Sequence, residues 1–551
     1  MVNLTLHDHQ AAYDQALSEL HDQNIVERIW QKDYTVWSDG PEEIVNRLGW
    51  LVSVETMQAA RNQISTFVDD VKADGLTNVL LLGMGGSSLA PDVFSTVFAD
   101  ADGLNLNVLD STDPGAVQAY ADTLDPANTI YIVATKSGST AETLSFFKYF
   151  YNQTVSALGA EKAGDHFVAI TDPGSKLVDL ASKHNFRRTF INDPNIGGRY
   201  SALSFFGIVP AALVGVDLDQ LFASAASATE NGRAAVSDNE GAQLGAAMGE
   251  LAKAGRDKIT LITDPAISAY GDWVEQLIAE STGKNGVGVL PVVQEPLDAP
   301  DAYRDDRFFV YMRLDGRHDE ALAALEQAGH PVARIAMSDV YDLGKLFFLW
   351  EMATVIAGQR LSIQPFDQPN VESAKVRAKE MITAYQEQGE LPSQQAAFST
   401  DNATVYGEVE ASDTQQALTE FLESAPDDGY IAIHAYIQPT PEADEALHDL
   451  RVTLRDKYKL ATTVGYGPRF LHSTGQLHKG DGGNGMFVQI TDDPSQDVSI
   501  PDEAGSDESA MSFGTLKLAQ ALGDRQALLD NNRQVIRFHF KDAVSGIQSL
   551  T

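Results

Sequence analysis

The residues with chemical potential in this sequence gather where apolar runs end in glycines and hydroxyl side chains. Residues 78–91, NVLLLGMGGSSLAP, place three glycines and the hydroxyls of Ser87 and Ser88 directly after an apolar run. An apolar run without polar alternation is typical of a strand buried on both faces, and glycine permits a sharp turn into the helix that we expect to follow. Free backbone N–H groups at the start of a helix bind anions. This stretch therefore predicts an anion site.

A second stretch of the same kind occupies residues 129–143, TIYIVATKSGSTAET. Its apolar run leads into an expected helix through a loop that carries, in order, Thr135, Lys136, Ser137 and Thr140. A single loop of this kind is equally well explained as a tight connection that needs glycine for a positive φ. Two such loops in one sheet, one of them with a lysine, favour a phosphate held between them.

Two further residues have types suited to acid–base chemistry and to charge stabilisation. Arg199 stands in GGRYS, just before a long uncharged stretch, and we expect an arginine in that position to face a cleft. The alternative is a surface arginine in a glycine turn. Glu280 ends the amphipathic run WVEQLIAE and precedes a turn, where a carboxylate is more often simply solvated. Both alternatives stay open on local sequence alone.

The length and composition place the chain among multidomain globular proteins. A chain of 551 residues exceeds what one core usually organises, and 43% hydrophobic with 21% charged residues is typical of a globular protein. Cysteine is absent, which excludes disulfides and thiolate nucleophiles. The N-terminal residues have neither a basic start nor an apolar core of signal-peptide length, so we expect a cytoplasmic location.

The charge balance excludes several classes of partner. The sequence has 78 acidic against 39 basic residues, for a formal net charge of -39, which repels nucleic acid and anionic membranes. The longest uncharged stretch, residues 200–216, contains proline and glycines and is shorter than the about 20 residues of a membrane span. We therefore expect no nucleic-acid or membrane partner, and oligomerisation stays open.

The order of the apolar runs predicts an α/β architecture in four parts. Residues 1–75 have mostly helical periodicity. Over residues 76–256, and again over residues 257–390, apolar runs alternate with helical segments, which predicts two doubly wound parallel sheets. After a polar linker, residues 400–551 predict a smaller α/β extension.

Five motifs resemble those of one enzyme family. GMGGSSLAP, TKSGSTAET, GGRYSALS, AESTGK and PFDQPNVESAK occur in this order between residues 75 and 390 and resemble the glucose-6-phosphate isomerase family. The likeness is greatest to the isomerase half of transaldolase and phosphoglucose isomerase fusion proteins, including their C-terminal extension. It implies two sugar-isomerase (SIS) domains and the reversible isomerisation of glucose 6-phosphate and fructose 6-phosphate, in glycolysis and gluconeogenesis, with no cofactor and no metal.

The resemblance also implies a role for particular residues. It makes Glu280 the catalytic base, Arg199 the cation near the reacting carbons, and Lys375 a catalytic residue of the last motif. The residues that it implies in binding a small phosphorylated sugar are Ser87, Thr135, Lys136, Ser137, Thr140, Gln276 and Gln368.

These residue types suit the reaction. Interconverting an aldose and a ketose moves a proton between C1 and C2, and one carboxylate can take it from one carbon and return it to the other through a cis-enediol. Negative charge that develops on the enediolate oxygen needs a fixed cation. Phosphate binding away from the reacting carbons contributes orientation.

The sequence departs from the family at the histidine that opens the sugar ring. The family commonly supplies it from a Gly-Gln-His motif soon after the catalytic glutamate, and no such motif follows Glu280. A Gly-Gln-Leu-His run ends at His478, which makes that residue a candidate for ring opening. The alternative is a loop histidine that only hydrogen-bonds locally.

Two other functions compete with the isomerase. The glycines after residue 82 could belong to a dinucleotide fingerprint of an oxidoreductase, but Ser88 stands at the third glycine position. A non-catalytic SIS-domain protein that only binds sugar phosphates is the other alternative. Such a sensor would need neither Glu280 nor Lys375, so their presence favours the enzyme.

Overall fold

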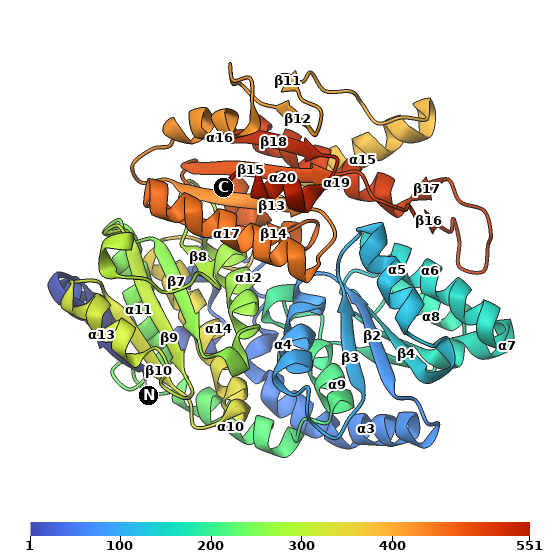
Figure 1. Ribbon diagram of the computed structural model, residues 1–551. Helices are drawn as coiled ribbons and strands as arrows, with labels where there is room; N and C mark the ends of the chain where they lie inside the picture. Colours follow the sequence, from blue (N-terminus) through green and yellow to red (C-terminus); the bar gives the residue numbers. More distant parts are fainter. Residues whose placement is uncertain (1) are drawn as a thin grey trace.

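The computed structural model describes residues 2–551 and folds them around three open sheets covered by helices (Figure 1). The first two sheets lie side by side in the lower half of the view. The third sheet, built by the C-terminal part of the chain, lies across the top of both. Within the described residues, every helix is too short or too polar to cross a membrane.

The first sheet is wholly parallel, with the strand order β3-β2-β4-β5-β6. Its strands are β2 (Asn78–Gly83), β3 (Asn105–Leu109), β4 (Thr129–Ala134), β5 (Phe167–Thr171) and β6 (Arg188–Ile191). Strand order reverses between β2 and β4. Ligands of doubly wound sheets bind beyond the carboxyl ends of the strands at such a reversal, and these two strands lead into the two hydroxyl-rich loops.

Successive side chains along β2 and along β4 pack alternately into two separate cores, one on each face of the sheet. Val79 and Leu81 pack into one core, and Leu80 and Leu82 into the other. The unbroken apolar run thus reflects burial on both faces, and the prediction of a doubly wound sheet is confirmed. The helices of this part are α3 (Ser53–Ala73), α4 (Leu89–Val97), α5 (Pro114–Thr123), α6 (Ala141–Leu158), α7 (Ala160–Ala163), α8 (Lys176–Lys183), α9 (Phe205–Val214), α10 (Leu218–Asn231) and α11 (Glu240–Lys253).

The second sheet has the order β1-β10-β9-β7-β8 and is parallel except at one edge. Its strands are β7 (Lys258–Thr263), β8 (Leu290–Val293), β9 (Arg307–Arg313), β10 (Val332–Ala336) and β1 (Val2–Thr5). Its helices are α12 (Tyr270–Thr282), α13 (Asp319–Gln327) and α14 (Leu343–Arg360), and α15 (Val371–Gln388) then leads away from it.

We expected the N-terminal segment to be helical, but part of it forms a strand. It contains α1 (Gln10–Asp22) and α2 (Ile25–Trp30), but it begins with β1, which pairs antiparallel with β10. Four residues are too few for their periodicity to distinguish a strand from a helix. Pairing with a distant edge strand decides the conformation of this segment.

The third sheet has the order β11-β12-β18-β15-β13-β14 and its own hydrophobic core. Its parallel strands are β13 (Tyr430–Tyr436), β14 (Ala461–Tyr466), β15 (Gly485–Asp492) and β18 (Gln534–Phe540), and β11 (Phe398–Ser399) and β12 (Ala403–Tyr406) form an antiparallel edge. A separate two-stranded ribbon is β16 (Ser499–Ile500) with β17 (Met511–Ser512). The helices are α16 (Thr414–Glu423), α17 (Pro441–Tyr458), α18 (Gly475–Gly480), α19 (Phe513–Asp530) and α20 (Ala543–Gln548).

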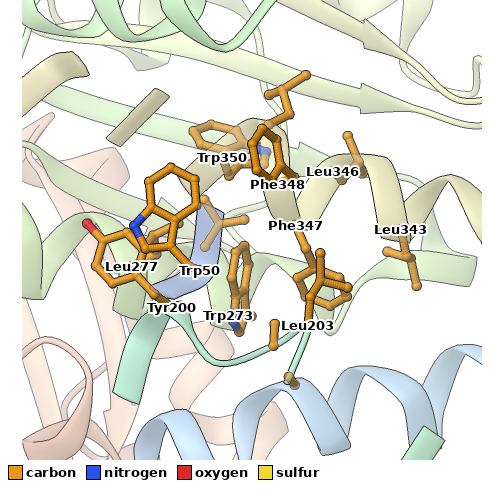
Figure 2. Close-up of a cluster of buried hydrophobic side chains, with 14 of the residues drawn as sticks. Trp50, Tyr200, Leu203, Trp273, Leu277, Leu343, Leu346, Phe347, Phe348 and Trp350 are labelled. Carbon is orange, nitrogen blue, oxygen red and sulfur yellow. The ribbon is translucent and has the colours of Figure 1, made fainter. Parts of the chain in front are cut away.

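Helix α14 is the centre of the core that the first two sheets share (Figure 2). The ring of Phe347 lies 4.7 Å from that of Trp273, centroid to centroid, and Phe348 lies 5.4 Å from Trp50. Helix α11 packs closely on α14 because it presents glycine there: a Cβ at Gly245 would come within 2.3 Å of the carbonyl oxygen of Ala353. This packing fixes α12, which lies against α14 and carries Glu280.

Replacing Phe347 by alanine tests the importance of this core. The residue is fully buried, so we expect Phe347→Ala to lower the free energy of unfolding by about 3–5 kcal/mol through lost contacts and a cavity. Urea unfolding followed by far-UV circular dichroism measures it. The control is Val376→Ala on the exposed surface of α15, for which we expect less than about 0.5 kcal/mol. A Phe347→Ala loss as small as the control would contradict the central position of this ring.

Candidate active site

The loop after β2 presents an unused hydroxyl at the reversal of strand order. The 3-10 turn η4 (Gly85–Ser87) joins β2 to α4, and the partly exposed Ser87 hydroxyl makes no hydrogen bond within residues 2–551. Ser88 is fully buried, and its hydroxyl donates to Asp110 Oδ2 at 3.1 Å and to the carbonyl oxygen of Gly85 at 3.2 Å. Ser88 therefore holds the turn, and Ser87 is the hydroxyl left for a ligand.

The two glycines of this turn allow other parts of the chain to approach it. Gly85 has a positive φ of 54°, and a Cβ there would lie 2.7 Å from the carbonyl oxygen of His472 and 2.9 Å from Gln276 Nε2. A Cβ at Gly86 would lie 2.1 Å from the carbonyl oxygen of Gly198. Segments that belong to all three sheets can meet at η4 only because Gly85 and Gly86 have no Cβ atom.

The loop after β4 gathers hydroxyls at the start of α6. The hydroxyls of Thr135 and Thr140 are 2.8 Å apart, and those of Ser137 and Ser139 are 3.0 Å apart. Lys136 donates from Nζ to a carboxylate oxygen of Asp172 and to the carbonyl oxygen of Pro194 at 3.0 Å. The structure places this loop beside the turn after β2, as expected for neighbouring parallel strands.

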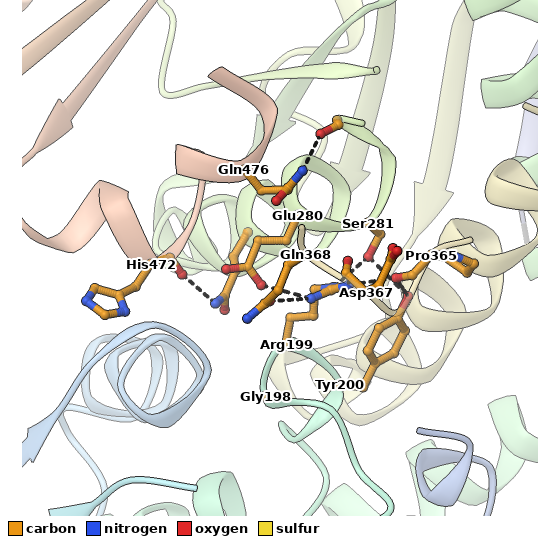
Figure 3. Close-up of polar contacts among 12 residues, drawn as sticks. Gly198, Arg199, Tyr200, Glu280, Ser281, Pro365, Asp367, Gln368, His472 and Gln476 are labelled. Atoms are coloured by element: carbon orange, nitrogen blue, oxygen red, sulfur yellow. Dashed lines mark hydrogen bonds and ion pairs between the residues drawn. The ribbon is translucent and has the colours of Figure 1, made fainter. Parts of the chain in front are cut away.

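Arg199 is buried and held by hydrogen bonds to three segments of the chain (Figure 3). It lies in the turn η7 (Gly198–Tyr200), and its Nε donates to Ser281 Oγ at 2.8 Å. Nη1 donates to Glu280 Oε2 at 3.1 Å and to Gln368 Oε1 at 3.0 Å, and Nη2 donates to the carbonyl oxygen of Pro365 at 2.8 Å. The guanidinium is therefore fixed beside Glu280, and it is not the surface arginine of the alternative interpretation.

Glu280 lies near the end of α12, and only 6% of the residue is exposed. Burial raises the pKa of this carboxyl, while the positive charges of Arg199 and His472 oppose the increase. The net direction is upward. A carboxyl with a raised pKa accepts a proton near neutral pH more readily than an exposed one.

His472 joins this site from the third sheet, and no motif in the sequence pointed to it. It ends the turn η11 (Arg469–His472), and its carbonyl oxygen accepts from Gln276 Nε2 at 2.6 Å. Its ring Nε2 lies 3.0 Å from Glu142 Oε1. Gln520 Nε2 donates to the same Glu142 oxygen at 2.6 Å, so the carboxylate that orients the imidazole is itself held in place.

Glu142 is ionised in this arrangement. Burial alone would raise its pKa, but the charge of His472 and its hydrogen bond outweigh burial and lower it. Glu142 is the second residue of α6, where the helix dipole also favours a negative charge.

Lys284 is a further buried cation that the sequence analysis did not assign. Its Nζ donates to Asp367 Oδ1 at 2.8 Å and to the carbonyl oxygens of Asp367 at 2.5 Å and Gln364 at 2.9 Å. Burial and the nearby charge of Arg199 lower its pKa to about 8, against the opposing effect of Asp367. It fixes the turn from which Gln368 reaches Arg199.

Gln476 links this turn to the third sheet. Its Oε1 accepts from the backbone N–H of Asn370 at 2.8 Å, and its Nε2 donates to Asn370 Oδ1 at 2.7 Å and to the carbonyl oxygen of Gly283 at 2.9 Å. The segments after α12 and α14 are thereby tied to α18.

Lys375, which we expected in the site, lies on α15 with its side chain 51% exposed. Its Nζ donates to Glu372 Oε1 at 2.9 Å and to none of the other predicted site residues. Its charge nevertheless helps to keep the pKa of Glu142 low.

His478, our candidate for ring opening, lies apart from the other predicted residues. It is 2% exposed, with its ring 4.8 Å from that of His434 and 5.1 Å from that of Phe487. Neither ring nitrogen has a hydrogen-bond partner within residues 2–551, and burial keeps the pKa of His478 well below its usual value. Helix α18 directs this side chain into the core of the third sheet. The histidine that faces Gln276 and Glu142 is His472.

Comparison with known proteins identifies the family. A family model described as phosphoglucose isomerase matches residues 31–288. The glucose-6-phosphate isomerase of Rubrobacter xylanophilus is 30% identical over 360 residues, which cover 55% of this chain and 82% of that relative. The chain belongs to the phosphoglucose isomerase family.

A second relative and a solved structure are also similar to this chain. A probable glucose-6-phosphate isomerase of Haloarcula marismortui is 26% identical over 374 residues, covering 61% of this chain and 83% of the relative. The crystal structure of a glucose-6-phosphate isomerase from Chlamydia trachomatis has the same fold, with a TM-score of 0.58 at 16% identity, over 68% of this chain and 86% of that one. The range that matches the family model includes Ser87, Arg199 and Glu280 and ends before Gln368 and His472.

Metal-binding side chains do not gather in this structure: no group of three or more His, Asp or Glu within residues 2–551 could hold an ion.

The raised pKa of Glu280 predicts the acid limb of the pH–rate profile. A catalytic base at Glu280 would have to be ionised to act, so activity should fall as the pH decreases through the pKa of Glu280, which lies above the usual value of 4.5. We expect kcat/KM for fructose 6-phosphate to begin its fall above pH 4.5. Replacing Arg199 by methionine removes the main charge that lowers the pKa of Glu280. The acid limb of the residual activity should therefore move to higher pH. A limb below pH 4.5 would contradict a buried base.

Proposed function

We propose that the protein is a glucose-6-phosphate isomerase, which interconverts glucose 6-phosphate and fructose 6-phosphate in glycolysis and gluconeogenesis in the cytoplasm. The observation that carries the proposal is the buried contact between Glu280 and Arg199, next to two hydroxyl-rich loops, in a chain of the phosphoglucose isomerase family. A non-catalytic sugar-phosphate-binding protein would gain nothing from placing a carboxylate in this setting.

The phosphate of the sugar would lie between the loops after β2 and β4. The free hydroxyl of Ser87 and the start of α6 supply donors, and the other contacts that we propose are Thr135, Lys136, Ser137 and Thr140. This binding is remote from the reacting carbons, so its free energy can serve orientation.

Glu280 would transfer the proton between C1 and C2. Its carboxylate takes the proton from one carbon to give a cis-enediol and returns it to the other, so no electrons leave the sugar. Arg199 would stabilise the negative charge on the enediolate oxygen. Because its hydrogen bonds already fix the guanidinium, little reorganisation is needed when that charge develops.

His472 is our proposal for the residue that opens the sugar ring, in place of His478. Ring opening moves a proton between the ring oxygen and the C1 hydroxyl, which a histidine near the sugar can do. The hydrogen bond to Glu142 fixes the orientation of the imidazole, and 21% of the His472 side chain is exposed for access to a ligand. Gln276 and Gln368 would bind sugar hydroxyls, and Lys375 would contribute charge from α15.

The coupled assay of fructose 6-phosphate conversion tests the function and the base together. Glu280→Gln keeps the shape of the side chain but cannot accept a proton, so we expect kcat to fall by at least about 10²-fold with little change in sugar-phosphate binding. Glu230→Gln, at an exposed position on α10, is the control and should retain full activity. Near-normal kcat in Glu280→Gln would show that another residue moves the proton.

The two histidines are distinguished by a pair of variants. We expect His472→Ala to lose at least about 10²-fold in kcat on cyclic glucose 6-phosphate and much less on an open-chain analogue. His478→Phe keeps an aromatic ring where both nitrogens are unpaired, so it should remain folded and active. An active His472→Ala with an inactive but folded His478→Phe would restore the assignment made from the sequence.

A further inference from the structure

A cavity lies beside the candidate active site, beneath the third sheet. Its volume is about 770 Å³, which is within the range of small-molecule sites. Its walls come from the carboxyl ends of β3 and β8, from α12, and from α17 and β14 of the third sheet. None of the residues assigned above to the isomerase reaction lines it. The edge strands of both SIS sheets therefore end at a space that the isomerase proposal does not use.

One basic and one acidic side chain of the cavity wall lack hydrogen-bond partners within residues 2–551. Arg451 on α17 is 4% exposed, and its Nε and one Nη have no hydrogen-bond partner within residues 2–551. Glu275 on α12 makes no hydrogen bond or ion pair in the same part of the chain, and none joins it to Arg451. Leaving a buried guanidinium unpaired is costly. A ligand carboxylate at the part of Arg451 that lines the cavity would supply the missing counter-charge, and an ammonium group of the same ligand could donate to Glu275.

The other charged side chains of the cavity wall either form ion pairs with one another or lie on the wall opposite Glu275. Arg469 ion-pairs with Asp92 at 2.7 Å, Asp110 at 2.8 Å and Asp272 at 3.5 Å, so these carboxylates are not free. Across the cavity, α17 presents two more carboxylates. In all, the lining carries six carboxyl groups and two guanidiniums, Asp92, Asp110, Asp272, Glu275, Asp444 and Glu445 with Arg451 and Arg469.

We propose that this cavity binds a free amino acid of the cationic class, with its α-ammonium at Glu275 and its α-carboxylate at Arg451. A zwitterion fits because Arg451 is cationic, whereas Glu275 becomes a carboxylate when an ammonium group binds beside it, and no hydrogen bond or ion pair joins the two side chains. A positively charged side chain is favoured by the excess of carboxylates, with Asp444 and Glu445 as its counter-charges. The same excess disfavours sugar phosphates, so this site differs in chemistry from the catalytic one.

Ligand binding at Glu275 should be accompanied by a measurable release of protons. Burial, together with the charge of Asp272, raises the pKa of this carboxyl to about 8. At pH 7 it is therefore mostly protonated in the free protein. An ammonium group at the carboxyl favours the ionised form, so binding should release up to about one proton per ligand.

Titration calorimetry on the full chain tests the proposal, with L-arginine as the probe at pH 7. We expect saturable binding of L-arginine with a stoichiometry of one. Agmatine, which lacks the α-carboxylate, and N-acetyl-L-arginine, which lacks the α-ammonium, should each bind at least about tenfold more weakly. Titration in two buffers of different ionisation enthalpy should reveal the released proton. Absence of saturable binding at millimolar L-arginine, or equal binding of agmatine, would overturn the proposal.

Three variants assign the effect to the cavity. Glu275→Gln and Arg451→Gln should each weaken L-arginine binding at least about tenfold, and Glu275→Gln should abolish proton release. Glu442→Gln, an exposed carboxylate on α17 that does not line the cavity, is the matched control and should bind normally. Thermal unfolding checks that each variant is folded. Unchanged binding in a folded Glu275→Gln protein would place the ligand elsewhere. The outcome is independent of the isomerase proposal, because neither measurement uses the sugar reaction.

Discussion

The buried ion pair between Arg199 and Glu280 is the interaction on which the candidate active site depends. The two residues are brought to 3.1 Å by segments that belong to different sheets, and Arg199 also holds the turn at residues 365–368. A buried charge is tolerated only when it is paired and hydrogen-bonded, so the three segments must dock together for Arg199 to be buried at all. The same contact leaves Glu280 with a raised pKa, because Arg199 only partly offsets its desolvation. The contact between Arg199 and Glu280 therefore both joins the first two sheets and sets the pKa of Glu280.

The third sheet completes this arrangement instead of standing apart from it. It sends η11 to the turn after β2, where the carbonyl oxygen of His472 accepts from Gln276, and α18 to the turn after α14, where Gln476 binds Asn370. Glycines at residues 85 and 283 make room for these approaches, since a Cβ at Gly283 would lie 2.3 Å from the Cα of Leu477. Arg469 adds ion pairs to α4, to α12 and to the end of β3. The C-terminal part of the chain therefore shapes both the candidate active site and the neighbouring cavity.

Helix α12 separates these two spaces and contributes to both. Gln276 and Glu280 face the candidate active site, whereas Asp272 and Glu275 line the cavity. Successive residues of a helix point in directions about 100° apart, so one helix can supply two sites on different sides. The turn η11 is divided in the same way, with Arg469 on the cavity and His472 on the active-site side.

The sequence by itself determined the elements whose signals are local. Unbroken apolar runs identified β2 and β4, because a strand buried on both faces needs no polar alternation, and the glycine- and hydroxyl-rich loops after them follow from the turn that must come next. Motifs of residue type and order pointed to Arg199 and Glu280. Each of these signals is contained in a short stretch of consecutive residues, so no knowledge of the rest of the chain is needed to find it.

Only the tertiary structure decided what depends on contacts between distant residues. It made a strand of residues 2–5 by pairing them with β10, and it brought His472 to Glu142 across 330 residues of sequence. The Gly-Gln-Leu-His run pointed to His478, but the direction of α18 buries that ring and leaves it without a hydrogen bond to any of the residues that the structure describes. Lys284 and Gln520 carry no local signal either, because their roles come from the carboxylates and carbonyl groups that folding places beside them. A side chain's surroundings are set by the packing of whole elements, and residue spacing does not encode that packing in any short stretch.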